Sequence, residues 1–122
     1  MARILWCEDS ARVRQLIELI FRKSAHDLQL FESPTAAIDD YTAYGADLIV
    51  TDLRMPEMDG LALVKELRRR GAVETPVIVC SASSNHNARV AIEAAGATYL
   101  PKPFSSADLN RAVAVALDRL AA

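Results

Sequence analysis

The sequence has few of the residues and segments that mark several classes of protein. Only two cysteines, four glycines and five prolines occur among 122 residues, which excludes disulfide scaffolds, collagen-like repeats and long disordered linkers. No apolar run approaches the ~20 residues that a helix needs to cross a bilayer. The N-terminal segment lacks a basic region followed by an apolar core, so no secretory signal is predicted. These absences favour a small cytoplasmic protein.

The chain also lacks an excess of charge of one sign. Fourteen basic and 16 acidic residues give a formal net charge of −2, whereas nucleic-acid-binding modules usually carry a basic excess. We therefore expect no direct binding to nucleic acid or to a membrane. Cys7 and Cys80 lie inside apolar runs without a metal-binding motif, so we expect two buried thiols rather than a disulfide.

Short apolar runs alternate with longer segments in which apolar residues recur at helical spacing. The length suits one domain, which we place at residues 1–122. The runs predict strands at 4–7, 28–31, 48–51, 77–80 and 98–100. Helices are predicted at about 11–21, 34–44, 61–70, 85–95 and 106–120, and the fourth has the weakest apolar face. Leu16 is placed in the buried stripe of the first helix.

Five strand–helix repeats predict an α/β protein whose parallel sheet is covered by helices on both faces. In such sheets, groups that bind or react lie just beyond the carboxyl ends of the strands. The residues that follow four of the strands are polar: Glu8 and Asp9, then Asp52, Ser81 and Lys102. We therefore expect three carboxylates, a hydroxyl and an amine to gather at one edge of the sheet.

This set of side chains has the chemistry of a phosphoryl-transfer site. Two carboxylates ~4 Å apart repel by about 4 kcal/mol at an effective dielectric of ~20, so three require a cation or a raised pKa. All the candidate ligand atoms are oxygens, which suits a hard cation such as Mg²⁺. A lysine can neutralise a phosphate, and a carboxylate can attack phosphorus to form an acyl phosphate.

Four motifs in chain order resemble those of the response-regulator receiver domain of two-component signalling, of the single-domain chemotaxis-regulator type. They are Trp6-Cys7-Glu8-Asp9, Thr51-Asp52 through Gly60, Cys80-Ser81-Ala82 and Tyr99 through Phe104. The resemblance covers essentially the whole chain. It implies a flavodoxin-like, doubly wound (βα)5 fold with a five-stranded parallel sheet in the order 2-1-3-4-5.

The resemblance also implies roles for individual residues. Asp52 matches the aspartate that takes the phosphoryl group, and Lys102 matches the lysine that pairs with it. Ser81 corresponds to the hydroxyl that contacts a phosphoryl oxygen. Tyr99 corresponds to the aromatic residue that changes rotamer when this hydroxyl moves, so Ser81 and Tyr99 form the expected switch. The bond before Pro103 is expected to be cis.

The same resemblance implies a Mg²⁺ site. Asp9, Asp52 and the backbone carbonyl of Arg54 match the metal ligands, and Glu8 matches the acidic residue that holds the metal through water. Two positions depart from the commonest pattern: Glu8 is longer than aspartate, and Ser81 lacks the methyl group of threonine. We also hypothesise that the Arg54 side chain influences the lifetime of the phosphoryl group.

The expected donor is a phosphohistidine on a histidine kinase or phosphotransfer protein, and it would dock on the first helix, where Arg12 and Arg14 lie outside the apolar stripe. The chain would catalyse only its own phosphorylation and dephosphorylation. Phosphorylation would switch the face formed by the fourth helix, fifth strand and fifth helix, which would contact a downstream protein. The family often dimerises on phosphorylation, and the sequence leaves a homodimer open. If the chain is complete, it has no room for a separate output domain.

Two other functions fit parts of the sequence. An interaction module of the same fold would not need all of Asp9, Asp52, Ser81 and Lys102. A Mg²⁺-dependent phosphohydrolase would form the same aspartyl phosphate, but it typically has a second aspartate two residues after the nucleophile, where this chain has Arg54.

Several other residues have structural interpretations. We expect Trp6 in the core, Met55 and Met58 against apolar surface, and residues 68–70 at a solvated helix end. His26 and His86 are placed in loops, in structural or exposed positions.

Overall fold

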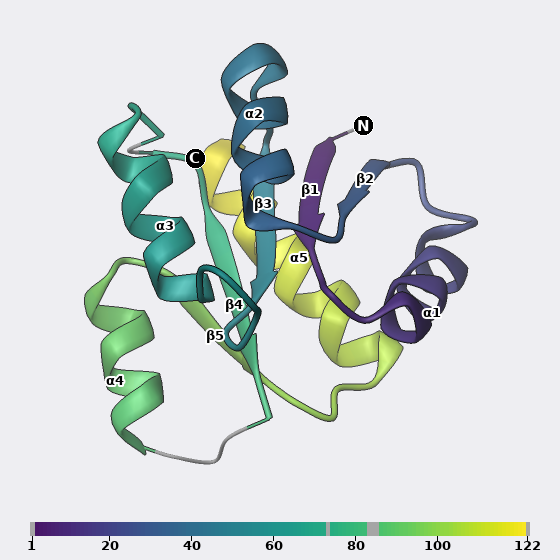
Figure 1. Ribbon diagram of the computed structural model, residues 1–122. Coiled ribbons are helices and arrows are strands. Elements are labelled where there is room, and N and C mark those ends of the chain that lie inside the picture. Colours follow the sequence, from purple (N-terminus) through teal and green to yellow (C-terminus); the bar gives the residue numbers. More distant parts are fainter. Residues whose placement is uncertain (1, 73, 83–85, 122) are drawn as a thin grey trace.

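The sheet defines the architecture of the protein, for which a computed structural model describes residues 2–72, 74–82 and 86–121 (Figure 1). All strand pairs are parallel, and the strand order is β2-β1-β3-β4-β5. The strands are β1 (Arg3–Cys7), β2 (Asp27–Phe31), β3 (Leu48–Asp52), β4 (Val77–Ser81) and β5 (Thr98–Pro101). The predicted α/β class and the order 2-1-3-4-5 are confirmed.

A helix follows each strand. The helices are α1 (Ala11–Phe21), α2 (Pro34–Tyr44), α3 (Gly60–Arg69), α4 (His86–Ala94) and α5 (Ser106–Ala121). Ser10, Ser33 and Asp59 cap the first three helices by accepting hydrogen bonds from backbone N–H groups. None of the helices in the described ranges is long and apolar enough to cross a membrane.

The starts of the last two helices differ in what the structure describes. At α5, the Ser105 and Asp108 side chains accept hydrogen bonds from each other's backbone N–H and form a capping box. His86 was expected in a loop, but it is the first residue of α4. The predicted start of this helix at Asn85 lies outside the described residues.

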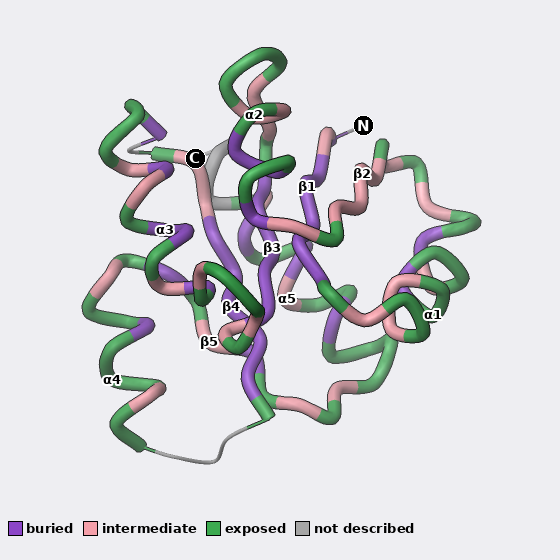
Figure 2. Tube along the Cα trace, viewed as in Figure 1, coloured by how far each residue is buried: buried purple, intermediate pink, exposed green. Residues whose placement is uncertain are grey.

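The sheet separates two apolar clusters, one under α1 and α5 and the other under α2, α3 and α4. Alternate residues of β1 enter opposite clusters: Ile4 and Trp6 face α1 and α5, and Leu5 and Cys7 face the other helices. Figure 2 shows β3 and β4 buried along their length, as expected of central strands covered on both sides.

Both cysteines are free and buried, as predicted. Cys7 belongs to one cluster and Cys80 to the other, so the sheet lies between the two thiols and prevents a disulfide. Burial raises the pKa of Cys7 to about 12, with further contributions from the Glu8 and Asp52 carboxylates. Burial also raises the pKa of Cys80. Neither thiol is therefore a reactive thiolate at neutral pH.

Aromatic rings fill the cluster under α1 and α5. Trp6 is 1% exposed, as predicted for a core residue. Its ring contacts Phe21 edge-on, with centroids 6.1 Å apart, and lies 6.3 Å from Phe104. Leu16 and Leu19 of α1 remain 54% and 55% exposed. The prediction of a buried Leu16 is wrong, because α1 packs through Ile17 and Phe21 and turns the Leu16 side away from the sheet.

The basic end of α3 divides into two parts. Arg69 and Arg70 form ion pairs with Glu66 and remain exposed, as expected of a solvated helix end. Arg68 is less exposed, because its guanidinium folds back and donates hydrogen bonds to the carbonyl oxygens of Ala72 and Thr75. A longer contact of 3.4 Å reaches Gly96 O, just after α4. Arg68 therefore joins the end of α3 to the turn after α4.

Candidate functional site

The carboxyl ends of four neighbouring strands form the candidate site. Glu8 and Asp9 follow β1, Asp52 ends β3, Ser81 ends β4, and Lys102 follows β5. Because β1, β3, β4 and β5 are adjacent in the sheet, residues distant in sequence meet at one edge. The backbone of Lys102 is held beside β4 by a 2.8 Å hydrogen bond from its N–H to Ser81 O.

Three carboxylates converge at this edge, as expected from the sequence. One oxygen each from Glu8, Asp9 and Asp52 lies within 4.8 Å of the others. Glu8 and Asp52 are buried, at 1% and 8% exposure, whereas Asp9 is exposed. Glu8 Oε2 accepts a hydrogen bond from Ser10 N at 3.1 Å, but its Oε1 is buried and accepts none from the described residues. One buried carboxylate oxygen thus remains available to a ligand.

Burial and the adjacent Asp52 carboxylate raise the pKa of Glu8 to about 7, against the opposing effects of Ser10 and Lys102. The cluster is therefore strained electrostatically in the absence of a cation. Lys102 supplies the one positive side chain seen within this cluster in the described ranges: its Nζ forms an ion pair with Asp52 Oδ1 and lies 3.5 Å from Glu8 Oε1. Burial lowers the pKa of Lys102, but Asp52 and Glu8 outweigh burial and leave it raised.

A small pocket of about 200 Å³ opens above the Asp52 carboxylate. Ser81, Lys102 and Arg54 line it together with Asp52. Ser81 is buried, whereas Arg54 is exposed at the mouth. The pocket therefore combines a buried carboxylate, a hydroxyl and an ammonium group around a space of the size of a small anion.

The loop between β3 and α3 brings Arg54 to the pocket. Gly60 closes this loop by donating a 2.7 Å hydrogen bond to Leu53 O. A side chain at Gly60 would collide with the carbonyl oxygen of Asp52, so glycine is required for the close approach. Glu57, within the loop, has a φ of 72°, which is uncommon for a residue other than glycine.

The expected switch residues lie on adjacent strands but differ in environment. Ser81 is buried at the pocket, while Tyr99 of β5 is half-buried and packs on the cluster under α2, α3 and α4. The Lys102–Pro103 peptide bond is cis, as expected. The structure therefore places Ser81 at the pocket and Tyr99 on the α4 side of the sheet.

One contact near the site was not apparent from the sequence. Arg14 was assigned to a docking surface, but its Nη1 donates hydrogen bonds to the carbonyl oxygens of Glu8 and Asp9, at 2.9 and 3.1 Å. Its Nη2 also lies 3.6 Å from Glu32 Oε2. Arg14 thus supports the backbone of the acidic pair. Its position in the first turn of α1, five and six residues after that pair, is the sequence signal that could have indicated this role.

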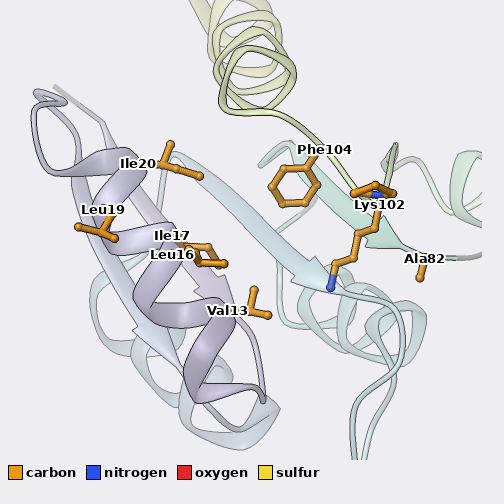
Figure 3. Close-up of a pocket in the computed structure, with 9 residues that line it drawn as sticks. Val13, Leu16, Ile17, Leu19, Ile20, Ala82, Lys102 and Phe104 are labelled. Atoms are coloured by element: carbon orange, nitrogen blue, oxygen red, sulfur yellow. The ribbon is translucent and has the colours of Figure 1, made fainter.

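An apolar groove of about 540 Å³ runs from the site along α1. In Figure 3, Val13 and Leu16 of α1 lie on one side, Phe104 lies opposite, and Lys102 lies at one end. Because Lys102 and Ala82 also line the small pocket, the groove and the pocket are continuous.

Comparisons with known proteins place these features in a family. A family model described as the response regulator receiver domain matches residues 4–114. The chemotaxis protein CheY of Bacillus subtilis is 32% identical over 106 residues, which cover 85% of this chain and 88% of that protein. The transcriptional regulator NtrC of Klebsiella pneumoniae is 37% identical over 114 residues, or 92% of this chain. The chain spans only 24% of that relative's length.

Solved structures agree with this family. The receiver domain of the Francisella response regulator 1452 superimposes with a TM-score of 0.90 at 29% identity, covering 98% of this chain and 99% of that one. Chemotaxis protein CheY4 of Vibrio cholerae gives a TM-score of 0.89 at 25% identity, covering 96% and 99%. The chain belongs to the family of response-regulator receiver domains of two-component signalling.

Proposed function

We propose that the chain is the phosphoacceptor of a two-component phosphorelay and that Asp52 receives the phosphoryl group. The observation that carries the proposal is the ion pair of Lys102 with a buried Asp52, beside Glu8 and Asp9. A buried carboxylate already paired with an ammonium group is poised to exchange that partner with an incoming phosphoryl oxygen. The proposed domain comprises residues 1–122.

The acidic cluster also fits a Mg²⁺ ion. Its side-chain ligand atoms are all oxygens, and Glu8 Oε1 is a buried acceptor without a hydrogen bond from the described residues. Asp9, Asp52 and the Arg54 carbonyl would hold the ion directly, and Glu8 would hold it through water. When bound, Mg²⁺ would offset the negative charge of the carboxylates and of the transferring group.

The chain's own residues account for the transfer step. An Asp52 oxygen attacks the phosphorus, the P–N bond of the phosphohistidine breaks, and its electron pair stays on the imidazole nitrogen. Lys102 Nζ moves from the carboxylate to a phosphoryl oxygen and remains protonated. Ser81 Oγ donates a hydrogen bond to another phosphoryl oxygen. Most of the catalysis is therefore positioning and charge neutralisation, as expected for phosphoryl transfer.

The groove along α1 is the proposed docking surface for the donor, a histidine kinase or a phosphotransfer protein. Leu16 and Leu19 are exposed there, and Lys102 joins the groove to the phosphoacceptor pocket. A partner helix that covers the apolar groove would thus bring its histidine close to Asp52. Arg12, exposed on α1, would contact acidic residues of the same partner.

The proposed output runs through Ser81 and Tyr99 to the face formed by α4, β5 and α5. Val90 of α4 and Val115 of α5 are about half exposed, at 49% and 50%, which suits a protein-binding face. The partner would be a downstream protein in the cytoplasm or a second phosphorylated copy of the chain. Direct contact with nucleic acid is not part of the proposal.

Intact mass after incubation with Mg²⁺ and a small acyl phosphate tests this function. We expect an adduct of one phosphoryl group, absent in Asp52→Asn and absent when EDTA removes the metal. Asp47→Asn is the matched control. Asp47 directly precedes β3, at the other end of the strand from Asp52, and its Oδ2 accepts a hydrogen bond from Arg3 N. The control should be phosphorylated normally.

Two outcomes would contradict the proposal. An unmodified wild-type protein under all donors would indicate an interaction module. Repeated turnover of phosphomonoesters would indicate a phosphohydrolase instead.

A further inference from the structure

We propose that Met55 is a positioning residue for the metal site. Its thioether sulfur accepts a hydrogen bond from the Cys7 thiol, and this contact holds the Arg54 carbonyl in place. The inference rests on the proposed function in one respect, namely that this carbonyl is a Mg²⁺ ligand. The contact joins the end of β1 to the loop between β3 and α3.

Two buried side chains surround the Met55 sulfur. Cys7 Sγ, at the end of β1, donates a hydrogen bond to Met55 Sδ at 3.5 Å. Thr51 Oγ1, on β3, lies 3.7 Å from the same sulfur. Cys7 and Thr51 are register partners in the parallel sheet, so the sulfur lies against two adjacent strands at once. The loop is thus fastened to the strands that carry Glu8 and Asp52.

The two contacts are not equivalent. The single Thr51 hydroxyl proton can also be donated to the Asp52 carbonyl oxygen, which lies closer, at 3.0 Å. Among the hydrogen bonds recorded for the described residues, the Cys7 thiol has Met55 Sδ as its acceptor. The Cys7 contact is therefore the one that specifically requires a sulfur at position 55.

Arg54 lies between two fixed neighbours. On one side, Leu53 N donates to Cys80 O at 2.8 Å, and Leu53 O accepts from Gly60 N at 2.7 Å. On the other side, Met55 is fastened through its sulfur. The Arg54 side chain is exposed and lies at the pocket mouth. The position of its carbonyl therefore depends on the residues on either side rather than on Arg54 itself.

The thioether contributes more than apolar volume. Leucine fills a space similar to that of methionine and packs comparably, but it cannot accept a hydrogen bond. Replacing the sulfur would leave the buried Cys7 donor unsatisfied and release the loop from β1. Met58 packs against the same apolar cluster from the same loop, and no sulfur contact is recorded for it among the described residues. It offers a matched control.

The test compares Met55→Leu with Met58→Leu by calorimetric titration of the metal-free protein with Mg²⁺. We expect Met55→Leu to raise the Mg²⁺ dissociation constant about tenfold, the range found when residues that orient metal ligands are replaced. Met58→Leu should bind Mg²⁺ like the wild type. A thiol is a weak hydrogen-bond donor, so the Tm in EDTA should fall only slightly more in Met55→Leu than in Met58→Leu. A loss of about tenfold in Mg²⁺ affinity beside so small a difference in Tm separates positioning of the ligand from a general loss of packing.

Cys7 variants test the other half of the contact. Cys7→Val should weaken Mg²⁺ binding as Met55→Leu does, and the double variant should be no weaker than either single variant. Cys7→Ser, which keeps a donor, should restore part of the affinity.

Three results would overturn the inference. They are wild-type affinity in Met55→Leu, equal losses in Met55→Leu and Met58→Leu, and additive losses in the double variant. A wild-type protein that binds no Mg²⁺ would instead overturn the proposed metal site and this inference with it.

Discussion

Helices α3 and α4 cover the same face of the sheet, yet they are held very differently. In α3, four of ten residues are buried: Gly60, Leu63, Val64 and Leu67. In α4, Ile92 is the single buried residue of the nine that form the helix. Both helices follow strands that deliver a site residue, Asp52 for α3 and Ser81 for α4.

The difference separates two tasks at one edge of the sheet. The start of α3 is locked to Asp52 by the close approach of Gly60, so movement of α3 would disturb the proposed phosphoacceptor itself. The α4 helix, with less buried surface, can shift at lower cost. The proposed function needs both properties, because the site would have to keep its geometry while phosphorylation moved another element.

The largest expected effect on stability comes from truncating a buried side chain in each of the two helices. Leu63 and Ile92 are both 0% exposed. Leu63→Ala should lower the free energy of unfolding by about 3 kcal/mol, through the lost transfer energy and the cavity. Ile92→Ala should lower it by less, about 2 kcal/mol or below, because α4 can detach locally before the domain unfolds. Urea unfolding combined with amide hydrogen exchange measures both effects.

In Ile92→Ala, fast exchange should be confined to α4 and its flanks. Equal losses of global stability, with no local increase in exchange at α4, would show that the two helices are held alike.

A smaller effect is expected from the link between the two helices. Arg68→Met removes the donors to Ala72 O, Thr75 O and Gly96 O. The expected cost is about 1 kcal/mol, since these carbonyls can regain water. Hydrogen exchange should accelerate at the turn after α4, near Gly96. Arg69→Met is the control, since exposed Arg69 pairs with Glu66 of its own helix. Unchanged exchange in both variants would contradict the link.

The smallest effect concerns the exposed ion pairs. Hydrogen bonds and charge from Arg69 and Arg70 lower the pKa of Glu66 to about 2. A lowered pKa stabilises the fold above the ordinary pKa of 4.5, and this contribution is lost as the pH falls toward 2. Glu66→Gln should therefore lower the Tm by a small amount at neutral pH, on the order of 1 °C, and by less near pH 3.

Glu93→Gln in α4 should have a still smaller effect, since the ion pair of Glu93 with Arg89 spans 3.3 Å between two exposed side chains. The Tm of Glu66→Gln and of Glu93→Gln, measured by thermal unfolding from neutral pH to about pH 3, tests this order. A Glu66→Gln deficit that grows as the pH falls would reverse the sign and contradict the assignment.

Much of the fold could be predicted because its signals are local. Each predicted strand is present within one residue at either end, since buried parallel strands are short apolar runs. The gathering of Glu8, Asp52 and Lys102 was predictable for a related reason: parallel strands end at the same edge. One apolar run followed by a polar residue was enough to place each of them.

The contacts that could not be predicted depend on three-dimensional packing. The periodicity of α1 includes Leu16 in the buried stripe, but the helix rotates that residue outward into the groove. Arg68 belongs to a run of three arginines, and nothing in that run distinguishes the one that folds back. The Met55–Cys7 contact joins residues 48 positions apart, and neither belongs to a motif that predicts it.

The strand order has a practical consequence for experiments on this protein. Strand β2 lies at the edge of the sheet, and among the described residues neither β2 nor α2 supplies a side chain to the acidic cluster or the pocket. Ala43, exposed near the end of α2, is therefore a suitable attachment point for a fluorophore or an affinity handle. A label there would follow the protein through the proposed signalling cycle from an element that belongs to neither the proposed docking groove, the proposed phosphoacceptor pocket nor the proposed output face.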